Sequence, residues 1–471
     1  MRIFFLVCLF GGIHSALSLS SYVRTSHGPI EGFEYDSAAV FLGIRYGKPP
    51  VGERRFEKPE AIGNWTEPLQ AKSFGPSCHP TTPQNYTTFS EDCLFLNIMA
   101  PKRDPVTAYP VIIYIHGGGL ESGGAVKRGY EHIVKNFVNE GIVFVTINYR
   151  LGPFGFLTTA DDVLPGNLGL WDQLLALKLV SEMISSFNGD PNRITLMGDS
   201  SGAMSVSAFT LSPLANSRKD MFPPPFCALD LFHQAVQMSG TFYSLPLKGN
   251  RKHGLNFLDT VGCTEKNLYQ AKECLKKSSL EEILKVTYKF RFYINEADSD
   301  YKSCLTQLVN LVSDINFNVP VFQEAIEKLH NNWPVYLYIE KFYSMSPRRA
   351  LFPVDGSFHS NEIPYLFGKG SMLPVIVTKE SNEFKRNLLH SLTSFVKYGE
   401  PRSVSVPWDR MSVSSPFTYM ELNATCEAKS DFFEKRIQFW TTDVANHVDL
   451  EELKSILPQA KRNIYSKKRT P

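Results

Sequence analysis

The sequence lacks the features that mark several large classes of protein. Its 49 lysine and arginine residues nearly balance 47 aspartate and glutamate residues, so a nucleic-acid binder that depends on phosphate contacts is not expected. Beyond the N-terminus no apolar run approaches the roughly 18 residues of a membrane-spanning helix. The 31 glycines and 30 prolines follow no period, which excludes collagen and repeat arrays. No metal-ligand spacing and no dinucleotide-binding loop occurs, so we expect no metal and no cofactor.

The N-terminus is predicted to be a secretory signal peptide covering residues 1–18. Arg2 supplies a short positive region, residues 3–10 are apolar, and the small residues Ala16 and Ser18 suit a cleavage site. This order is typical of exported proteins, and the apolar run is too short to span a bilayer. The basic C-terminus carries neither an ER-retention tetrapeptide nor a lipid-anchor tail, so secretion into the extracellular space is expected.

An oxidising compartment changes what the cysteines are expected to do. Cys8 leaves with the signal peptide, and two pairs that are close in sequence are expected to form disulfides: Cys78 with Cys93, and Cys263 with Cys274. An odd number remains, so one thiol is free or pairs outside the chain; the three are Cys227, Cys304 and Cys426. Asn-x-Thr sequences predict N-glycosylation at Asn64, Asn85 and Asn423.

Short apolar runs between helical stretches indicate an α/β protein. Such runs suit parallel strands in a sheet that is covered on both faces. They occupy residues 111–115, 142–147, 194–197, 234–238 and 335–339. Residues 174–184 have helical spacing and join two of these strands. No internal repeat and no Gly/Ser linker occurs, so residues 19–471 are predicted to form a single domain.

The sharpest motif surrounds a serine. Ser200 is the centre of the pentapeptide from Gly198 to Gly202, after the expected strand at residues 194–197 and before a stretch that suits a helix. This is the context in which G-x-S-x-G acts as a nucleophile elbow. The glycines leave room for neighbouring backbone, so the serine hydroxyl projects from a tight turn. The helix that follows directs unpaired N–H groups at the site.

A glycine-rich loop precedes the elbow, in the order that acyl transfer on a hydrolase sheet needs. His116 and three glycines follow directly after the strand at residues 111–115. Glycines allow bare backbone N–H groups to approach an oxyanion. We expect the amides of Gly118, Gly119 and Ser201 to form an oxyanion hole with three donors.

These motifs belong to a wider pattern, through which the chain resembles the type-B carboxylesterases, the family that includes the cholinesterases. Further matching segments are residues 41–52 with Arg55 and Phe56, residues 90–98, 148–152 and 165–169, Asp172 with Gln173, and residues 189–191. The likeness runs from about residue 23 to about 285 and resumes from about 310 to about 433. It implies an α/β-hydrolase fold, with a central, mostly parallel sheet covered by helices on both faces. It also implies hydrolysis of small-molecule carboxylic esters.

The resemblance also implies the general base. The family carries its catalytic histidine in a segment of the form His-x-x-Glu-Ile-x-Tyr-x-Phe-Gly, and residues 359–368 have this form. His359 is therefore expected to accept the proton of Ser200 and to deliver it to the leaving alkoxide.

The third member of the triad has no counterpart in the sequence. In the family an acid lies between the nucleophile and the histidine, after the seventh strand of the sheet. Ser200 and His359 are 159 residues apart, which is shorter than the family's separation by roughly 80 residues. We therefore expect an internal deletion near residues 286–310 that removes both the acid and one strand.

One replacement for the acid follows from the residues themselves. Residues 286–294 alternate with period 2 and are predicted to form a strand that ends at Asn295 and Glu296. Glu296 would then take the acid position; the other interpretation is an acidic turn between elements. Without an acid, His359 lacks the partner that orients it and stabilises its charged form, which would lower the rate by about 10⁴.

Other departures from the family pattern concern substrate and environment. Asp199 stands where glutamate is usual, and Ser201 stands where alanine is usual. The loop from Cys78 to Cys93 contains no tryptophan. The cholinesterases bind their cationic substrate there through a tryptophan, so choline esters are not expected as substrates.

Two alternatives to an active esterase stay open. The first is a non-catalytic binding or adhesion module with a protein partner, as in the neuroligin branch of the family. The second is an inactive shortened isoform, which folds poorly because the absent strand leaves backbone groups unpaired. The retained Ser200 and His359 favour the enzyme, whereas the missing acid favours the alternatives.

Overall fold

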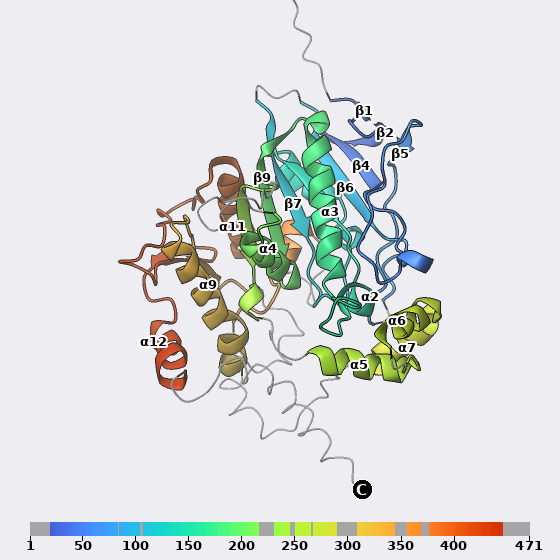
Figure 1. Cartoon of the computed structure of the whole chain (residues 1–471). Coiled ribbons are helices and arrows are strands. Elements are labelled where there is room, and N and C mark those ends of the chain that lie inside the picture. The colour runs from blue at the N-terminus through green and yellow to red at the C-terminus, as the bar shows by residue number, and fades with distance from the viewer. Residues whose placement is uncertain are drawn as a thin grey trace, which may run out of the picture.

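The computed structural model describes residues 19–82, 84–103, 107–215, 230–244, 250–264, 267–289, 309–343, 356–368 and 376–445. A seven-stranded sheet forms the centre, with strand order β10-β9-β7-β8-β6-β4-β3 (Figure 1). Two three-stranded sheets accompany it, of order β1-β2-β5 and β11-β12-β13.

The strands vary in length, and the longest, β9, spans 11 residues. The strands are β1 Tyr22–Arg24, β2 Pro29–Glu31, β3 Phe33–Tyr35, β4 Ala38–Arg45, β5 Leu69–Gln70, β6 Phe95–Pro101, β7 Tyr109–Ile115, β8 Val143–Ile147, β9 Gly189–Asp199, β10 Gln234–Met238, β11 Tyr338–Glu340, β12 Tyr419–Leu422 and β13 Glu427–Lys429. The helices are α1 Glu131–Ile133, α2 Gly152–Phe156, α3 Leu168–Met183, α4 Ser201–Leu211, α5 Asn250–Val261, α6 Leu268–Lys277, α7 Leu280–Lys289, α9 Val319–His330, α10 Ile363–Phe367, α11 Lys379–Tyr398 and α12 Glu434–Gln438.

The parallel part of the main sheet contains the strands that the apolar runs predicted. Strands β8, β7, β9 and β10 are mutually parallel neighbours, and β6, β4 and β3 continue the sheet in antiparallel fashion. The four runs expected between residues 111 and 238 are therefore confirmed as parallel strands of the main sheet, with β10 at its edge in the described part of the chain. The run at residues 335–339 is only partly a strand, because β11 is short and pairs with β12 outside the main sheet.

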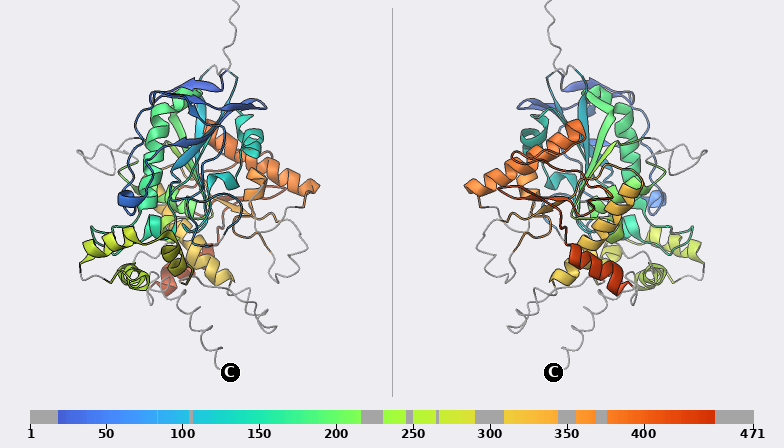
Figure 2. Two further views of the ribbon diagram at one scale, coloured as in Figure 1. Left: turned by 90° about the vertical axis from the view of Figure 1, so that its right-hand side faces the viewer. Right: turned by 90° about the vertical axis from the view of Figure 1, so that its left-hand side faces the viewer.

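Both faces of the main sheet are covered, as the continuous apolar runs required. Along β7 the side chains alternate between two buried clusters: Val111 and Ile113 pack in the cluster that contains α3, and Ile112 packs in the cluster that contains α11. The two helices accordingly lie on opposite sides of the sheet (Figure 2). Helix α11 presents Phe384 and Leu388 one turn apart to its face. The expected α/β class is confirmed.

The main sheet ends at β10 within the described part of the chain. There β10 pairs only with β9, whereas β11 belongs to the separate sheet. Helix α9 lies next to β10 through Glu324, whose carboxylate accepts from Gln237 Nε2 at 3.0 Å and from Ser207 Oγ at 2.7 Å. In the described residues, helix α9 therefore lies beside β10, the last strand of the main sheet.

The strand predicted for residues 286–294 is wrong over its first four residues, which belong to α7. The sequence carries a helix signal that competes with the period-2 pattern. Ser279 and Glu282 form a capping box: the Ser279 amide donates to Glu282 Oε2 at 2.8 Å, and the Glu282 amide donates to Ser279 Oγ at 3.2 Å. Ile283 and Val286 are then buried on one helix face. Residues 290–308 lie outside the described residues.

The two expected disulfides are present. Cys78 is bonded to Cys93, and Cys263 is bonded to Cys274. Cys426 is a buried free thiol, and Cys227 and Cys304 lie outside the described residues. No helix in the described part of the chain is long and apolar enough to cross a membrane.

Candidate active site

The nucleophile elbow forms where β9 meets α4. Ser200 joins them with φ 53° and ψ −121°, which is a strained conformation for a residue with a side chain. Its amide donates to the carbonyl of Met238 at 2.8 Å, and its carbonyl accepts from the amide of Met204 at 3.0 Å. Neighbouring backbone therefore holds the turn, and the expected order of strand, turn and helix is present.

The two glycines of the elbow are required by close backbone contacts. A Cβ on Gly198 would lie 2.4 Å from the carbonyl oxygen of Gly202. A Cβ on Gly202 would lie 2.1 Å from the carbonyl oxygen of Ile115. Since Ile115 is the last residue of β7, the elbow packs directly against the strand that leads into the glycine-rich loop.

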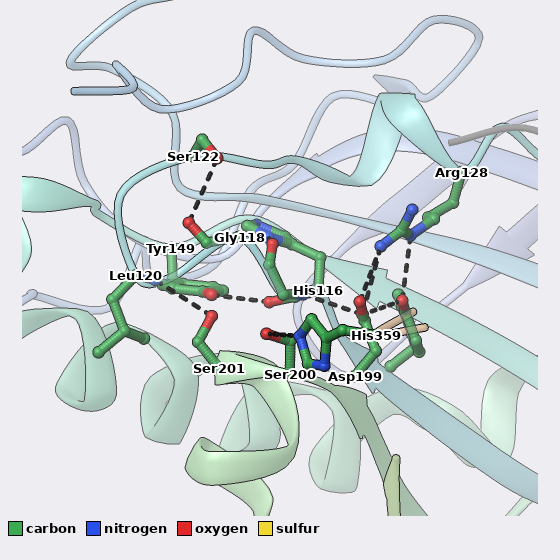
Figure 3. A network of polar contacts seen from close by, with 12 residues as sticks. His116, Gly118, Leu120, Ser122, Arg128, Tyr149, Asp199, Ser200, Ser201 and His359 are labelled. Carbon is green, nitrogen blue, oxygen red and sulfur yellow. Dashed lines mark hydrogen bonds and ion pairs between the residues drawn. The ribbon is translucent and has the colours of Figure 1, made fainter. Parts of the chain in front are cut away.

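His359 lies within hydrogen-bond distance of the nucleophile. Its Nε2 is 2.8 Å from Ser200 Oγ, and Figure 3 marks this contact with a dashed line. The ring packs against Phe317, with 5.1 Å between ring centroids. Burial lowers the pKa of His359, and the carboxylate of Asp199 partly opposes this effect. The imidazole is therefore neutral at pH 7 and suited to accept a proton from Ser200.

In a complete triad, an acidic side chain also bonds to the second ring nitrogen of the histidine. Among the described residues, no hydrogen bond or ion pair joins the His359 ring to an aspartate or glutamate. Glu296, the replacement considered from the sequence, lies outside the described residues. The strand that was predicted to end at Glu296 does not begin at residue 286, because residues 286–289 belong to α7.

The glycine-rich loop contributes two backbone amides near Ser200, and the elbow contributes a third. Gly118 and Gly119 have φ values of 130° and 68°, conformations that favour glycine. The loop is close to the nucleophile, because a Cβ on Gly117 would lie 2.9 Å from Ser200 Cβ. Within the described residues, the amides of Gly118, Gly119 and Ser201 have no hydrogen-bond acceptor. The sequence predicts that these three amides bind an oxyanion, and this role stays a prediction.

Asp199 is the centre of a buried polar cluster next to the nucleophile. Its carboxylate accepts from Arg128 Nη2 at 3.2 Å, from the Gly117 amide at 2.9 Å, and from the hydroxyl of Tyr114 (Figure 3). Burial opposes ionisation of Asp199, but the charge of Arg128 and the Tyr114 hydrogen bond outweigh it and lower the pKa of this carboxyl group. Asp199 and Arg128 therefore form a buried ion pair.

His116 is not a second base, although it begins the loop. Burial lowers its pKa to about 4, so the ring is neutral. It stacks on Tyr149, with 4.5 Å between ring centroids.

Two residues of the site were missed by the sequence analysis. Arg128 lies in a loop with no recognisable motif, and only its position in space makes it the partner of Asp199. Glu362 was visible in the histidine segment but was given no role. It is 3% exposed, and burial raises its pKa to about 7. A glutamate that follows the histidine by three residues, next to apolar Ile363, was the available signal.

The predicted glycosylation sites differ in accessibility. Asn64 and Asn85 are exposed. Asn423 is half-buried, and its Oδ1 accepts a hydrogen bond from the Ala424 amide at 2.9 Å. Elsewhere in the described residues, no three histidine, cysteine or acidic side chains gather in a way that would hold a metal ion.

Comparison with known proteins identifies the family to which the chain belongs. The model of the carboxylesterase family matches residues 19–293 and residues 287–440. The chain belongs to the carboxylesterase family. The two matched segments of this carboxylesterase family member meet at residues 287–293, where the sequence analysis expected a deletion.

Individual relatives agree with this assignment. The chain is 29% identical to Gut esterase 1 of Caenorhabditis briggsae, over 89% of this chain and 92% of that protein. It is 32% identical to the liver carboxylesterase of Sus scrofa, over 81% of this chain and 70% of that protein. A solved structure of PNB esterase, 24% identical, superposes with a TM-score of 0.73 and covers 88% of this chain and 98% of its own. The expected α/β-hydrolase fold is confirmed.

Proposed function

We propose that this carboxylesterase family member is a secreted serine hydrolase of small-molecule carboxylic esters. One observation carries the proposal: Ser200 Oγ lies 2.8 Å from His359 Nε2. Ser200 stands on a strained turn, and the amides of Gly118, Gly119 and Ser201 have no acceptor among the described residues. Nucleophile, base and oxyanion donors are the parts that acyl transfer needs. The names of the relatives, which describe esterases from several organisms, support the same reaction class.

The first half of the reaction would use the neutral form of His359. As Ser200 Oγ bonds to the ester carbonyl carbon, its proton passes to Nε2 of the imidazole. The carbonyl oxygen becomes an oxyanion and is held by the amides of Gly118, Gly119 and Ser201. When the tetrahedral intermediate collapses, the C–O bond to the alcohol breaks and His359 returns the proton to the leaving alkoxide.

The second half repeats these steps with water. His359 takes a proton from a water molecule, whose oxygen attacks the acyl-enzyme carbonyl. The same three amides hold the second oxyanion. Collapse breaks the bond to Ser200 Oγ, which recovers its proton from His359, and the carboxylic acid leaves. Every proton donated is recovered, so the enzyme is regenerated.

In a full triad an acid bonded to the histidine stabilises its protonated form, and this chain differs at that point. In the described residues, Asp199 is the carboxylate whose charge favours protonated His359, but Arg128 is bonded to it and reduces that field. We propose slow turnover relative to a complete triad, since loss of the acid costs about 10⁴ in rate.

We also propose an internal deletion near residues 286–310 within one domain spanning residues 19–471. The family model matches in two segments that meet at residues 287–293. The alignment with Gut esterase 1 runs over 537 positions, more than the 471 residues of this chain. Part of that relative therefore lies opposite gaps. Secretion is proposed from the signal sequence, with support from the two disulfides.

A second candidate is a non-catalytic binding module. It is favoured because His359 has no acidic hydrogen-bond partner among the described residues. The end of the main sheet at β10 favours the third, an inactive shortened isoform. A fluorophosphonate probe separates the enzyme from both, because only an activated serine displaces fluoride from its phosphorus. We expect stoichiometric labelling of the wild type and none of Ser200→Ala. A monodisperse, cooperatively melting wild type that stays unlabelled would favour the binding module.

A further inference from the structure

Both neighbours of the nucleophile accept hydrogen bonds from the glycine-rich loop. On one side, Asp199 Oδ1 accepts from the Gly117 amide at 2.9 Å. On the other, Ser201 Oγ accepts from the Leu120 amide at 3.1 Å. Figure 3 shows the second contact beside Ser200. The two bonds attach the loop immediately before and immediately after the proposed donors Gly118 and Gly119.

Other contacts fix the rest of the loop. The Tyr149 hydroxyl donates to the carbonyl of His116 at 2.7 Å. The Gly118 carbonyl accepts from the Ser122 amide at 3.0 Å and from the Glu121 amide at 3.1 Å, which closes a tight turn. The amides of Gly117 and Leu120 are thus occupied by side chains that flank the nucleophile.

The loop needs these hydrogen bonds to hold its shape, because it consists largely of glycine. Residues without side chains have the largest conformational freedom, and the φ values of Gly118 and Gly119 are reached only by glycine at low cost. An oxyanion hole works because its donors are fixed before charge develops. A loop of consecutive glycines therefore needs external contacts to keep its amides aimed at the reacting carbon.

We propose that Ser201 is a positioning residue of the oxyanion hole through its side-chain oxygen, in addition to its backbone amide. The proposal rests on the proposed esterase function of the same site. Its hydroxyl holds the Leu120 amide and thereby fixes Gly118 and Gly119. An alanine at this position would supply the amide but would have no atom to hold the loop. Ser201 is 1% exposed, so water does not readily replace the lost bond.

Asp199 provides the matching attachment and Arg128 keeps it in place. The Arg128 guanidinium contacts both carboxylate oxygens at 3.2 Å, and its Nε donates to the Tyr114 hydroxyl at 3.0 Å. These contacts leave the carboxylate little freedom, so the Gly117 amide is held at a fixed distance from β9. The elbow and the loop therefore form one rigid unit.

The test compares Ser201→Ala with Ser205→Ala. Ser205 is a buried serine one turn further along α4. Its hydroxyl donates to the backbone carbonyl of Ser201 at 3.1 Å and accepts from Gln173 Nε2 at 3.3 Å, so it leaves the side chain of Ser201 and the loop untouched. With a nitrophenyl ester, Ser201→Ala should lower kcat by about 10-fold or more, below the roughly 10²-fold cost of deleting a donor outright, while KM stays within about twofold. Ser205→Ala should keep both values near those of the wild type.

Hydrogen exchange provides a readout that needs no activity. In a peptide covering residues 117–122, the Leu120 amide should be protected in the wild type and in Ser205→Ala, and should exchange faster in Ser201→Ala. Equal exchange in all three proteins would overturn the proposal, as would an unchanged kcat in Ser201→Ala. If the wild type hydrolyses no ester, the proposed function fails while the exchange result still decides the positioning role. If Ser201→Ala does not melt cooperatively, Ser201→Cys, which keeps the volume with a weak acceptor, takes its place.

Discussion

Burial sets the charges around Ser200 residue by residue. Asp199 and Glu362 are both nearly inaccessible to solvent, yet their carboxyl groups behave in opposite ways. Arg128 and Tyr114 bond to Asp199 and keep it ionised. Burial raises the pKa of Glu362 to about 7, and Glu362 is hydrogen-bonded to Glu340, whose pKa burial also raises, so these two carboxyl groups titrate together below neutrality. The site therefore holds one fixed negative charge and one that depends on pH.

Glu362→Gln should change stability in a pH-dependent manner. The folded pKa is raised above the unfolded value near 4.5, so the stabilising contribution is complete below pH 4.5 and is lost as the pH rises towards 7. Glutamine mimics the protonated form. We expect equal melting temperatures for wild type and variant at pH 4.5, and a more stable variant at pH 8 by roughly 1–3 kcal/mol.

The control for this measurement is Glu380→Gln, a fully exposed position. It should not reproduce the gain at pH 8. A Glu362→Gln variant that is destabilised equally at both pH values would show that Glu362 is ionised in the folded protein throughout.

The pH dependence of hydrolysis reports on His359 itself. Burial lowers the pKa of this imidazole below its usual 6.5, and the base must be neutral to act. On the acid side, the pH at which kcat/KM is half its plateau value should therefore lie below 6.5. Asp199→Asn should lower that pH further, because it removes the carboxylate that favours the protonated ring. A half-plateau pH clearly above 6.5 would contradict the account, because it would require a carboxylate in contact with the ring.

Single residues also show where sequence reasoning succeeds. The pairing of Ser200 with His359 was predictable because each lies in a segment whose local pattern is specific. The pairing of Arg128 with Asp199 was not, because an arginine in a loop carries no local signal of its partner. The hydroxyl of Ser201 was equally hidden: the sequence showed an unusual residue, but only three-dimensional proximity to Leu120 gives it a role.

The elbow and the glycine-rich loop depend on close approach between two backbone elements. Helix α4 begins so near the end of β7 that no side chain fits at Gly202. The same proximity lets Ser201 reach the Leu120 amide. Local patterns predicted both elements, and the contact between them follows from the parallel order of β7 and β9.

Gly202→Ala should separate these elements. Its Cβ would meet the Ile115 carbonyl oxygen at 2.1 Å, so backbone must shift, at an expected cost of about 2 kcal/mol or more. Chemical denaturation measures this cost. Gly52→Asn is the control, because no atom lies near its Cβ and asparagine tolerates its φ of 58°. Equal stability of both variants would contradict the close packing of the elbow.

Helix α7 shows why one element was predicted wrongly. Residues 286–294 alternate in a way that suits a strand, but the capping box at Ser279 and Glu282 starts a helix before them. Once the helix has begun, each added residue gains a hydrogen bond, so it extends to Lys289. The alternation of residues 286–294 alone therefore predicted the wrong element, because the capping box before it starts a helix.

Over the whole molecule, the central question is whether a shortened member of the family still forms a working site. The main sheet ends at β10 in the described residues, and β11 continues in a separate sheet. Nevertheless Ser200, from the main sheet, and His359, from the segment after β11, lie 2.8 Å apart. The main sheet and the contact between Ser200 and His359 are therefore present together in the described residues, whereas the position of an acid does not follow from them.

The most direct test of this account is hydrolysis of p-nitrophenyl acetate by the purified protein, measured beside Ser200→Ala. Both proteins are first shown to be monodisperse and to melt cooperatively. The account predicts hydrolysis by the wild type, with a loss of about 10³-fold or more in Ser200→Ala. A well-folded wild type with no activity above Ser200→Ala would contradict it.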